Sequence, residues 1–440
     1  GTSQPRLVPS WDATLVEPLE KPPLVQWFNQ RWADSRSTAA TALFPIIAGE
    51  QIVVRDQRGL RGLSLKTGTM LWQYRTPLNW QQRQQAFQRL LPVVRGGPDR
   101  VSLALGGNPR FGMITSDGRR VFAVQLAFQP TRSPAIRNAD RSTRAWPSQL
   151  VAVTIPGETS SGGAGSPNLK PSWIFPIAQR PATGPADEPS STDATAILGS
   201  AVPAGGQLLV LAERRRQVEL IGLSPISGQP LWRQPLANCD AGLTDAAGTN
   251  RHAKACLASQ AYGLAVCPTG TGVTVTVDLV DGTLQWAHDS RDAESSSSRF
   301  PVRGSARVRP LKADPGLANL PLLVDDRVIL LSPSASQLVC LELESGRLLW
   351  SRDRAELDYV ATAGNGTLLV VGHNHVLGLD LATGALRWQR RLGLVSGRGT
   401  HLANGRYLVP LKSGRIICLE LADGRKSGLS LPPGSSSISS

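Results

Sequence analysis

Two histidines separated by one residue are the side chains best spaced to bind a metal ion. His373 and His375 lie in the segment Gly-His-Asn-His-Val and would project from the same face of a strand. Two imidazoles are too few ligands for a complete zinc site. The segment also has the composition of a hairpin turn, so we interpret both histidines as turn residues and predict no metal site.

Acidic residues at Asp278, Glu342, Asp380 and Glu420 have the chemistry of general acids and bases. They occupy the same position in successive copies of a sequence repeat, where a polar strand residue faces the turn or the neighbouring copy. Their recurrence is therefore explained by the structure of the repeat and does not indicate catalysis. The chain also lacks a P-loop, a Gly-x-Ser-x-Gly elbow and an HExxH zinc motif, so we predict no catalytic residue and favour a protein that is not an enzyme.

The cysteines bear on the cellular compartment. Cys239 and Cys256 flank a polar segment and could close a disulfide loop of about 16 residues, which would stabilise the fold by about 3 kcal/mol. Cys267, Cys340 and Cys418 lie in apolar runs, as expected of small buried side chains. A disulfide would favour an oxidising, extracytoplasmic compartment, either periplasmic or associated with the cell envelope.

The composition excludes several classes of protein. The 440 residues are 41% hydrophobic and 18% charged, which excludes a disordered chain. No apolar stretch reaches the roughly 18 to 20 residues that a membrane-spanning helix needs. The sequence begins with Gly1, which is compatible with the removal of a leader or a lipid anchor. The net charge of +14 is spread along the chain, which argues against a nucleic-acid partner.

One repeated unit dominates the organisation of the chain. Alternating apolar and polar residues lead into Thr, Ser or Asp followed by Gly, and a tryptophan stands four residues after that glycine. Full copies end at Trp72, Trp232, Trp286, Trp350 and Trp388, and a further copy reaches Gly428 without a tryptophan. Alternation is typical of a strand, and the glycine permits the turn that reverses the chain. Together with two strands expected before it, each hairpin forms a four-stranded blade of a β-propeller.

The spacing of the tryptophans predicts the number of blades. The interval from Trp72 to Trp232 is too long for one blade, and the segment around Trp173 supplies another that is interrupted by insertions. The sequence thus predicts an all-β, seven-bladed propeller of antiparallel blades, with eight blades as the alternative. A strand containing Trp11 could complete the last blade and close the ring, because closure removes exposed strand edges.

The propeller is expected to occupy most of the chain. We predict an amino-terminal extension over residues 1–40, a single propeller domain over residues 41–430 and a flexible tail over residues 431–440. Helical spacing predicts two short helices that decorate the ring. They contain Leu24, Trp27, Phe28 and Trp32 in the first case and Trp80, Phe87 and Leu91 in the second.

The repeat resembles that of the quinoprotein, or PQQ-like, β-propellers over roughly Leu43 to Ser430. Within this family the chain is most similar to extracytoplasmic PQQ-like repeat proteins of no known activity, and more distantly to the BamB-type propellers of outer-membrane assembly. The resemblance implies that six tryptophans clamp adjacent blades together. These are Trp72, Trp173, Trp232, Trp286, Trp350 and Trp388.

The resemblance also raises the question of a cofactor. Quinoprotein dehydrogenases hold PQQ beneath a disulfide between adjacent cysteines, and bind Ca²⁺ through carboxylate and amide oxygens. This chain has no adjacent cysteines and no dense acidic cluster, so we expect neither PQQ nor calcium.

We therefore favour a non-enzymatic scaffold that binds protein partners of the cell envelope. Its expected surface lies on the amino-terminal blades, where the insertions and Arg214 to Arg216 are found. A PQQ-dependent dehydrogenase and a carbohydrate- or small-ligand-binding module are the alternatives.

Overall fold

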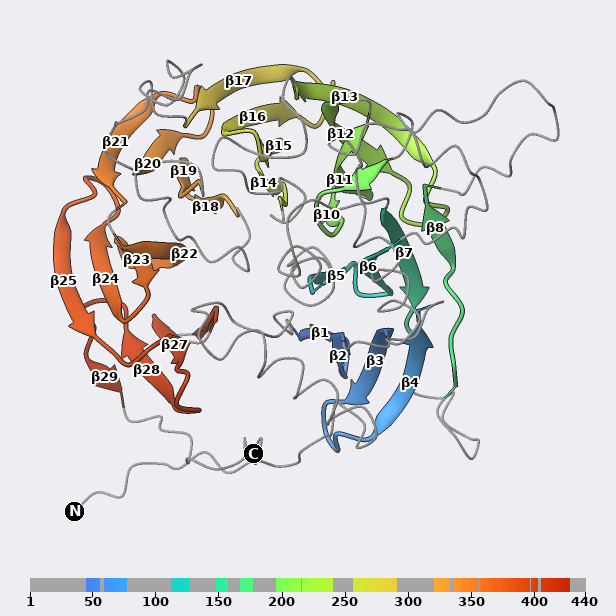
Figure 1. Cartoon of the computed structure of the whole chain (residues 1–440), viewed down its shortest axis with the longest axis horizontal. Helices are drawn as coiled ribbons and strands as arrows, with labels where there is room; N and C mark the ends of the chain where they lie inside the picture. Colours follow the sequence, from blue (N-terminus) through green and yellow to red (C-terminus); the bar gives the residue numbers. More distant parts are fainter. Residues whose placement is uncertain are drawn as a thin grey trace, which may run out of the picture.

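The described part of the chain is a ring of β-sheets. A computed structural model describes residues 45–55, 59–76, 112–126, 148–156, 167–176, 195–214, 216–239, 256–290, 320–332, 336–354, 356–395, 397–402 and 405–427. These residues form seven sheets arranged around a common centre (Figure 1). The two predicted helices and Trp11 lie outside the described residues.

The sheets follow one another along the chain as blades 1 to 7. Blade 1 comprises β1 (Ile46–Ala48), β2 (Gln51–Arg55), β3 (Gly59–Ser64) and β4 (Met70–Arg75). Blade 2 comprises β5 (Ile114–Ser116), β6 (Arg120–Leu126), β7 (Ser148–Thr154) and β8 (Trp173–Phe175). Blade 3 comprises β9 (Ala196–Ile197), β10 (Val202–Ala204), β11 (Gln207–Arg214), β12 (Gln217–Leu223) and β13 (Pro230–Asn238).

Blades 4 to 7 have four strands each, as blades 1 and 2 do. Blade 4 comprises β14 (Ser259–Ala261), β15 (Leu264–Pro268), β16 (Val273–Asp278) and β17 (Leu284–Asp289). Blade 5 comprises β18 (Leu322–Val324), β19 (Arg327–Leu330), β20 (Gln337–Glu342) and β21 (Leu348–Asp353). Blade 6 comprises β22 (Leu357–Gly364), β23 (Thr367–Gly372), β24 (His375–Asp380) and β25 (Leu386–Arg391). Blade 7 comprises β26 (Thr400–Leu402), β27 (Arg406–Pro410), β28 (Ile416–Glu420) and β29 (Lys426–Ser427).

Each blade is an antiparallel meander in which consecutive strands are hydrogen-bonded neighbours. Blade 3 has one additional strand, β9, which lies outside the meander β10-β11-β12-β13 and pairs with β11. The predicted seven-bladed propeller with four-stranded blades is therefore confirmed. In a meander the turn between strands one and two and the turn between strands three and four lie at the same end of the sheet. We call this end of each blade its turn end.

The hydrophobic core is divided among the junctions between blades. In blades 1 to 6 the second and third strands are largely buried on both faces, as in β23, whose six residues are all buried. In blade 7 the second strand, β27, alternates buried and partly exposed residues. The side chains of these strands meet those of the next blade in separate clusters, each of which combines two successive blades. The ring is thus stabilised by burial between sheets rather than by one central core.

A β-bulge recurs where the fourth strand begins. In blade 5, Cys340 pairs with Trp350 but Leu341 pairs with Leu348, so Leu349 is the extra residue. The same register shift occurs in blades 1, 3, 4 and 6. A bulge bends its strand and redirects a side chain. Here it places the tryptophan against the face of its blade two residues after the exposed start of the strand.

Candidate functional site

The acidic residues of the repeat stabilise the turns between third and fourth strands. In blade 6 the amide of Gly384 donates to the carbonyl of Asp380 at 2.8 Å, which closes the turn. The Asp380 carboxylate accepts the amides of Ala382 and Thr383 at 3.0 and 2.9 Å. The equivalent Asp278 accepts the amide of Val280 at 2.7 Å. These carboxylates therefore cap turns, as an Asx residue does, and do not converge on a reacting group.

Asp380 also makes the shortest ion pair of the repeat turns in blades 5 and 6. Its Oδ2 atom accepts Nη2 of Arg387 at 2.6 Å. Hydrogen bonds from Arg387 and then from Thr383 lower the pKa of the Asp380 carboxyl from 3.8 to about 2. A carboxyl whose pKa is lower in the folded chain stabilises the fold above its unfolded pKa and loses that contribution as it is protonated.

We therefore expect Asp380→Asn to lower the urea midpoint of unfolding at neutral pH, because asparagine keeps an acceptor for the turn amides but not the charge. The difference from the unsubstituted protein should shrink as the pH falls from 3.8 towards about 2. Circular dichroism at a series of pH values measures it. Glu344→Gln, at an exposed position in the turn of blade 5, is the control and should leave the midpoint unchanged. A pH-independent difference at Asp380 would contradict the assignment.

Four tryptophans connect their own blade to the turn of the next blade. The indole N–H donates to a backbone carbonyl of that turn at 2.8 to 3.0 Å. The pairs are Trp173 with Pro225, Trp286 with Leu343, Trp350 with Leu381 and Trp388 with Leu421.

The indole of each of these tryptophans also lies against the turn glycine of the next blade. A methyl group built on Gly384 would come within 2.7 Å of the Trp350 ring, and one on Gly346 within 2.6 Å of the Trp286 ring. The glycine therefore has two reasons to recur: its φ is positive, and a side chain would collide with the indole. We call this contact the indole clamp.

An arginine two residues after the tryptophan extends the clamp in blades 5 and 6. Arg352 donates to the carbonyl of Gly384 at 3.2 Å. Arg390 donates to the carbonyls of Gly424 at 3.1 Å and Asp423 at 2.9 Å. Because residues two apart on a strand share a face, the tryptophan and the arginine reach the same turn.

The other two tryptophans differ from the expected arrangement, because their indole N–H groups bond within their own blades. Trp72 donates to Oε1 of Gln51 at 2.6 Å, and Trp232 donates to Oε1 of Gln207 at 2.7 Å. Gln51 in turn donates to the carbonyl of Pro156 in blade 2 at 3.0 Å, so it connects Trp72 to the next blade. No such second bond is found for Gln207 in the part of the chain that the structure describes.

The junction between blades 3 and 4 therefore lacks the indole clamp. A methyl group built on the turn glycine Gly282 would meet no atom within 4 Å. Leu279 of the same turn is partly exposed, whereas its counterparts Leu343, Leu381 and Leu421 are buried. Blade 4 thus offers a turn built to receive an indole, and Trp232 of blade 3 does not reach it.

Exposed apolar side chains gather at the turn ends of the same two blades. Ile226 and Leu231 of blade 3 are 73% and 59% exposed, and Val280 and Leu284 of blade 4 are 91% and 49% exposed. Tyr262 belongs to this end because the amide of Leu279 donates to the carbonyl of its neighbour Gly263 at 2.8 Å. We call Ile226, Leu231, Tyr262, Val280 and Leu284 the junction surface. Exposed apolar residues on neighbouring turns of two blades can form a contact site for another molecule.

His373 lies in the turn between β23 and β24, at the other end of blade 6, whereas His375 is the first residue of β24, so only His373 is the predicted turn residue. His373 provides its carbonyl to the amide of Val395 at 3.0 Å, and burial lowers the pKa of the partly buried His375. Among the described residues, no three His, Cys, Asp or Glu side chains come together as metal ligands.

The cysteines are all buried. Burial raises the pKa of the Cys340 thiol to about 11 and that of Cys267 further still. Cys239 and Cys256 belong to the same hydrophobic cluster between blades 3 and 4. A disulfide between them stays a prediction.

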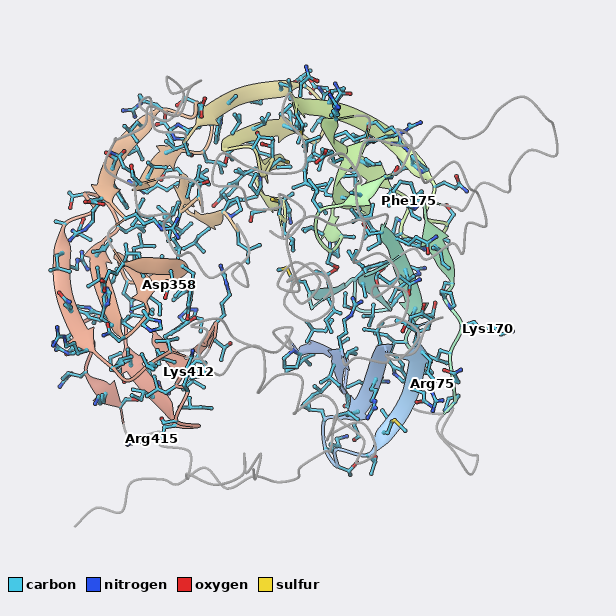
Figure 2. The ribbon with its side chains drawn as sticks, in the orientation of Figure 1. Arg75, Lys170, Phe175, Asp358, Lys412 and Arg415 are labelled. Carbon is cyan, nitrogen blue, oxygen red and sulfur yellow. The ribbon has the colours of Figure 1, made fainter. Side chains whose placement is uncertain are left out.

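The insertion in blade 2 returns along the outer edge of blade 1. The amide of Gln73 in β4 donates to the carbonyl of Pro167 at 3.1 Å, and the amide of Leu169 donates to the carbonyl of Gln73 at 2.7 Å. Lys170 and Arg75 consequently lie on the outer side of the ring (Figure 2). This pairing covers part of an edge strand that would otherwise be open. Arg214 and Arg216 lie at the end of blade 3 opposite its turn end.

Sequence reasoning missed the glutamines that hold Trp72 and Trp232. Gln51 and Gln207 both begin the second strand of their blades. The equivalent residues of blades 4 to 7 are Leu264, Arg327, Thr367 and Arg406. A glutamine at the start of the second strand was the signal that could have separated these two tryptophans from the others.

Comparisons with known proteins agree with this architecture. Residues 277–440 match the family model described as outer membrane protein assembly factor BamB. A search of curated protein sequences finds no match. No helix that could cross a membrane is present among the described residues.

Several solved structures are similar to this chain. BamB from Moraxella catarrhalis is 13% identical, with coverage of 88% of this chain and 86% of that chain and a TM-score of 0.49. A europium-containing methanol dehydrogenase is 11% identical, with coverage of 91% and 80% and a TM-score of 0.55. A quinohemoprotein alcohol dehydrogenase from Comamonas testosteroni is 9% identical, with coverage of 91% and 68% and a TM-score of 0.49. The match to the BamB family model and the fold shared with the methanol dehydrogenase confirm the predicted resemblance to PQQ-like and BamB-like propeller repeats.

Proposed function

We propose that this chain is a non-enzymatic, extracytoplasmic propeller that holds protein partners of the cell envelope, and that the junction surface is where it contacts them. The observation that carries the proposal is the loss of the indole clamp between blades 3 and 4, beside exposed Ile226 and Val280. A rigid ring fixed by clamps elsewhere keeps such a surface in one shape, which lowers the entropy cost of binding. The match of residues 277–440 to a BamB family supports an assembly role in the envelope.

The proposal excludes a dedicated redox centre. Similarity to a methanol dehydrogenase at 11% identity reports the fold, and a fold by itself does not carry an activity. Titration of the chain with PQQ and Ca²⁺, followed by dye reduction with an alcohol, should give no saturable binding and no turnover. Saturable binding of PQQ together with turnover would contradict the scaffold function and identify the chain as a quinoprotein.

The surface is tested with charged substitutions at positions that are already exposed. We expect the double variant Ile226→Glu, Val280→Glu to lower the recovery of crosslinked envelope partners by about tenfold or more, because buried charges at the centre of an interface are costly. Leu348→Glu with Leu386→Glu, at exposed apolar positions on the turn ends of blades 5 and 6, is the control.

Recovery is quantified by mass spectrometry after photo-crosslinking of the purified full chain with envelope fractions, and unfolding curves verify that both variants fold. A partner counts only when its recovery falls with the first variant and not with the control. Equal recovery with both variants would reject the junction surface as the contact site.

A further inference from the structure

The indole clamps formed by the tryptophans of blades 5 and 6 show which side-chain groups a turn of this protein binds. Each turn receives two side chains from one strand: an indole that lies on the glycine and donates to the leucine carbonyl, and a guanidinium that donates to the glycine carbonyl. Trp350 and Arg352 supply these groups to the turn of blade 6. Trp388 and Arg390 supply them to the turn of blade 7.

The turn of blade 4 has the same construction as the turn of blade 6. The amide of Gly282 donates to the carbonyl of Asp278 at 2.9 Å, and that of Gly384 donates to Asp380 at 2.8 Å. The φ angles of the two glycines are 76° and 72°. The amide of Leu279 is held by Gly263 as that of Leu381 is held by Gly366. The receiving half of the clamp is therefore already formed in blade 4.

The donating half is not supplied by blade 3. Trp232 is held by Gln207, and the position of the arginine is taken by Gln234, whose amide donates to the carbonyl of its neighbour Pro235 at 3.1 Å. Among the described residues, the carbonyls of Leu279 and Gly282 have no donor. In four other junctions a tryptophan of the preceding blade covers the turn and donates to the equivalent carbonyl. No described residue does so at the turn of blade 4.

We infer that the turn of blade 4 is a socket for an extended segment of a partner protein that carries the triplet Trp-x-Arg. This inference rests on the proposed scaffold function and names the chemistry of its partner. The tryptophan lies on Gly282 and donates to the carbonyl of Leu279, and the arginine donates to the carbonyl of Gly282. Trp-x-Arg is selected because a strand presents residues two apart on the same face.

Charge and shape around the socket favour the same ligand. The carboxylates of Asp278 and Asp281 accept the amides of Val280 and Thr283 within the turn, and the hydrogen bonds from Thr283 lower the pKa of Asp281, so this turn carries two negative charges that favour a cation. Ile226 and Val280 provide an apolar rim for the segment that flanks the tryptophan. Tryptophan and arginine are also the residues that most often dominate binding energy at protein interfaces.

The probe is the protein's own clamp sequence. A peptide of residues 385–391, Ala-Leu-Arg-Trp-Gln-Arg-Arg, is labelled with fluorescein at its amino terminus and amidated at its carboxyl terminus, and its anisotropy is measured as the full chain is added. We expect saturable binding with one site per chain. Peptides that carry Trp388→Ala or Arg390→Ala should bind at least about tenfold more weakly.

Two protein variants locate the site. Gly282→Asn fills the socket without a clash, since asparagine tolerates a positive φ and no atom lies within 4 Å of the new Cβ, and it should weaken binding at least about tenfold. Gly118→Asn makes the same change at an open glycine with positive φ in blade 2 and should leave binding unchanged.

The inference is overturned by the absence of saturable binding, by equal affinity for the peptide without tryptophan, or by an unchanged affinity of the Gly282→Asn variant. Each of these results would leave the scaffold function standing if the Ile226→Glu, Val280→Glu variant still lost its envelope partner. If the peptide shows none of the expected behaviour and the Ile226→Glu, Val280→Glu variant also keeps its envelope partner, both the socket and the proposed contact surface are rejected.

Discussion

Replacing Trp350 with alanine should lower the free energy of unfolding by about 3 to 5 kcal/mol. The indole is only 8% exposed and fills the space between blades 5 and 6, where it contacts Gly384 and donates to the carbonyl of Leu381. Its removal leaves a cavity that two stiff sheets cannot close, and a buried carbonyl without its donor. Urea denaturation followed by fluorescence or circular dichroism measures the change.

Trp232→Ala is the matched control for this result. The same residue type occupies the same position of a blade, but its indole is partly exposed and bonds to Gln207 of its own blade. We expect it to cost less than half as much. Equal losses at Trp350 and Trp232 would show that contact with the next blade adds no stability beyond burial of the ring in its own sheet.

The second large effect is expected from Gly346→Asn. Gly346 has a φ of 71°, and a Cβ atom there would lie 2.6 Å from the ring of Trp286. The indole would have to leave its place, which costs about 1 to 3 kcal/mol for overpacking and about 1 kcal/mol for the hydrogen bond to Leu343.

The same substitution at Gly282 separates this clash from the cost of the backbone. Gly282 has a φ of 76° and stands at the equivalent position of the preceding blade, but no atom lies within 4 Å of its would-be Cβ. Because asparagine tolerates this conformation, Gly282→Asn should change the unfolding free energy by no more than about 0.5 kcal/mol. If both variants lose the same stability, the indole clamp is not the cause.

The sequence predicted the blades well because the information for a blade is local. Alternation into Asp380-Leu-Ala-Thr-Gly384 and the tryptophan after it specify a strand, a turn and a second strand within about a dozen residues. Even the degenerate second blade could be located from Trp173 and its apolar neighbours. The β-bulge before each tryptophan could not be predicted, because a single extra residue leaves the alternation of a short outer strand unclear.

The candidate site could not be identified from the sequence. Ile226 and Val280 look like any other turn residues in the linear pattern, and Trp232 looks the same as Trp350. The contact surface that the sequence predicts at the insertions and at Arg214 to Arg216 stays a prediction. Trp232 differs from Trp350 only in the folded ring, because only contacts between sheets show which tryptophan reaches its neighbour.

By itself, then, the sequence determined the type of the blades and the glycine turns between their third and fourth strands, and it favoured seven blades over eight. Those features depend on alternation and on glycine, which act over a few neighbouring residues. Only the tertiary structure decided that Gln51 and Gln207 hold two of the tryptophans and that Gly282 is left uncovered. These features depend on the packing of one rigid sheet against the next, and residues that are brought together only by that packing leave no period in the sequence.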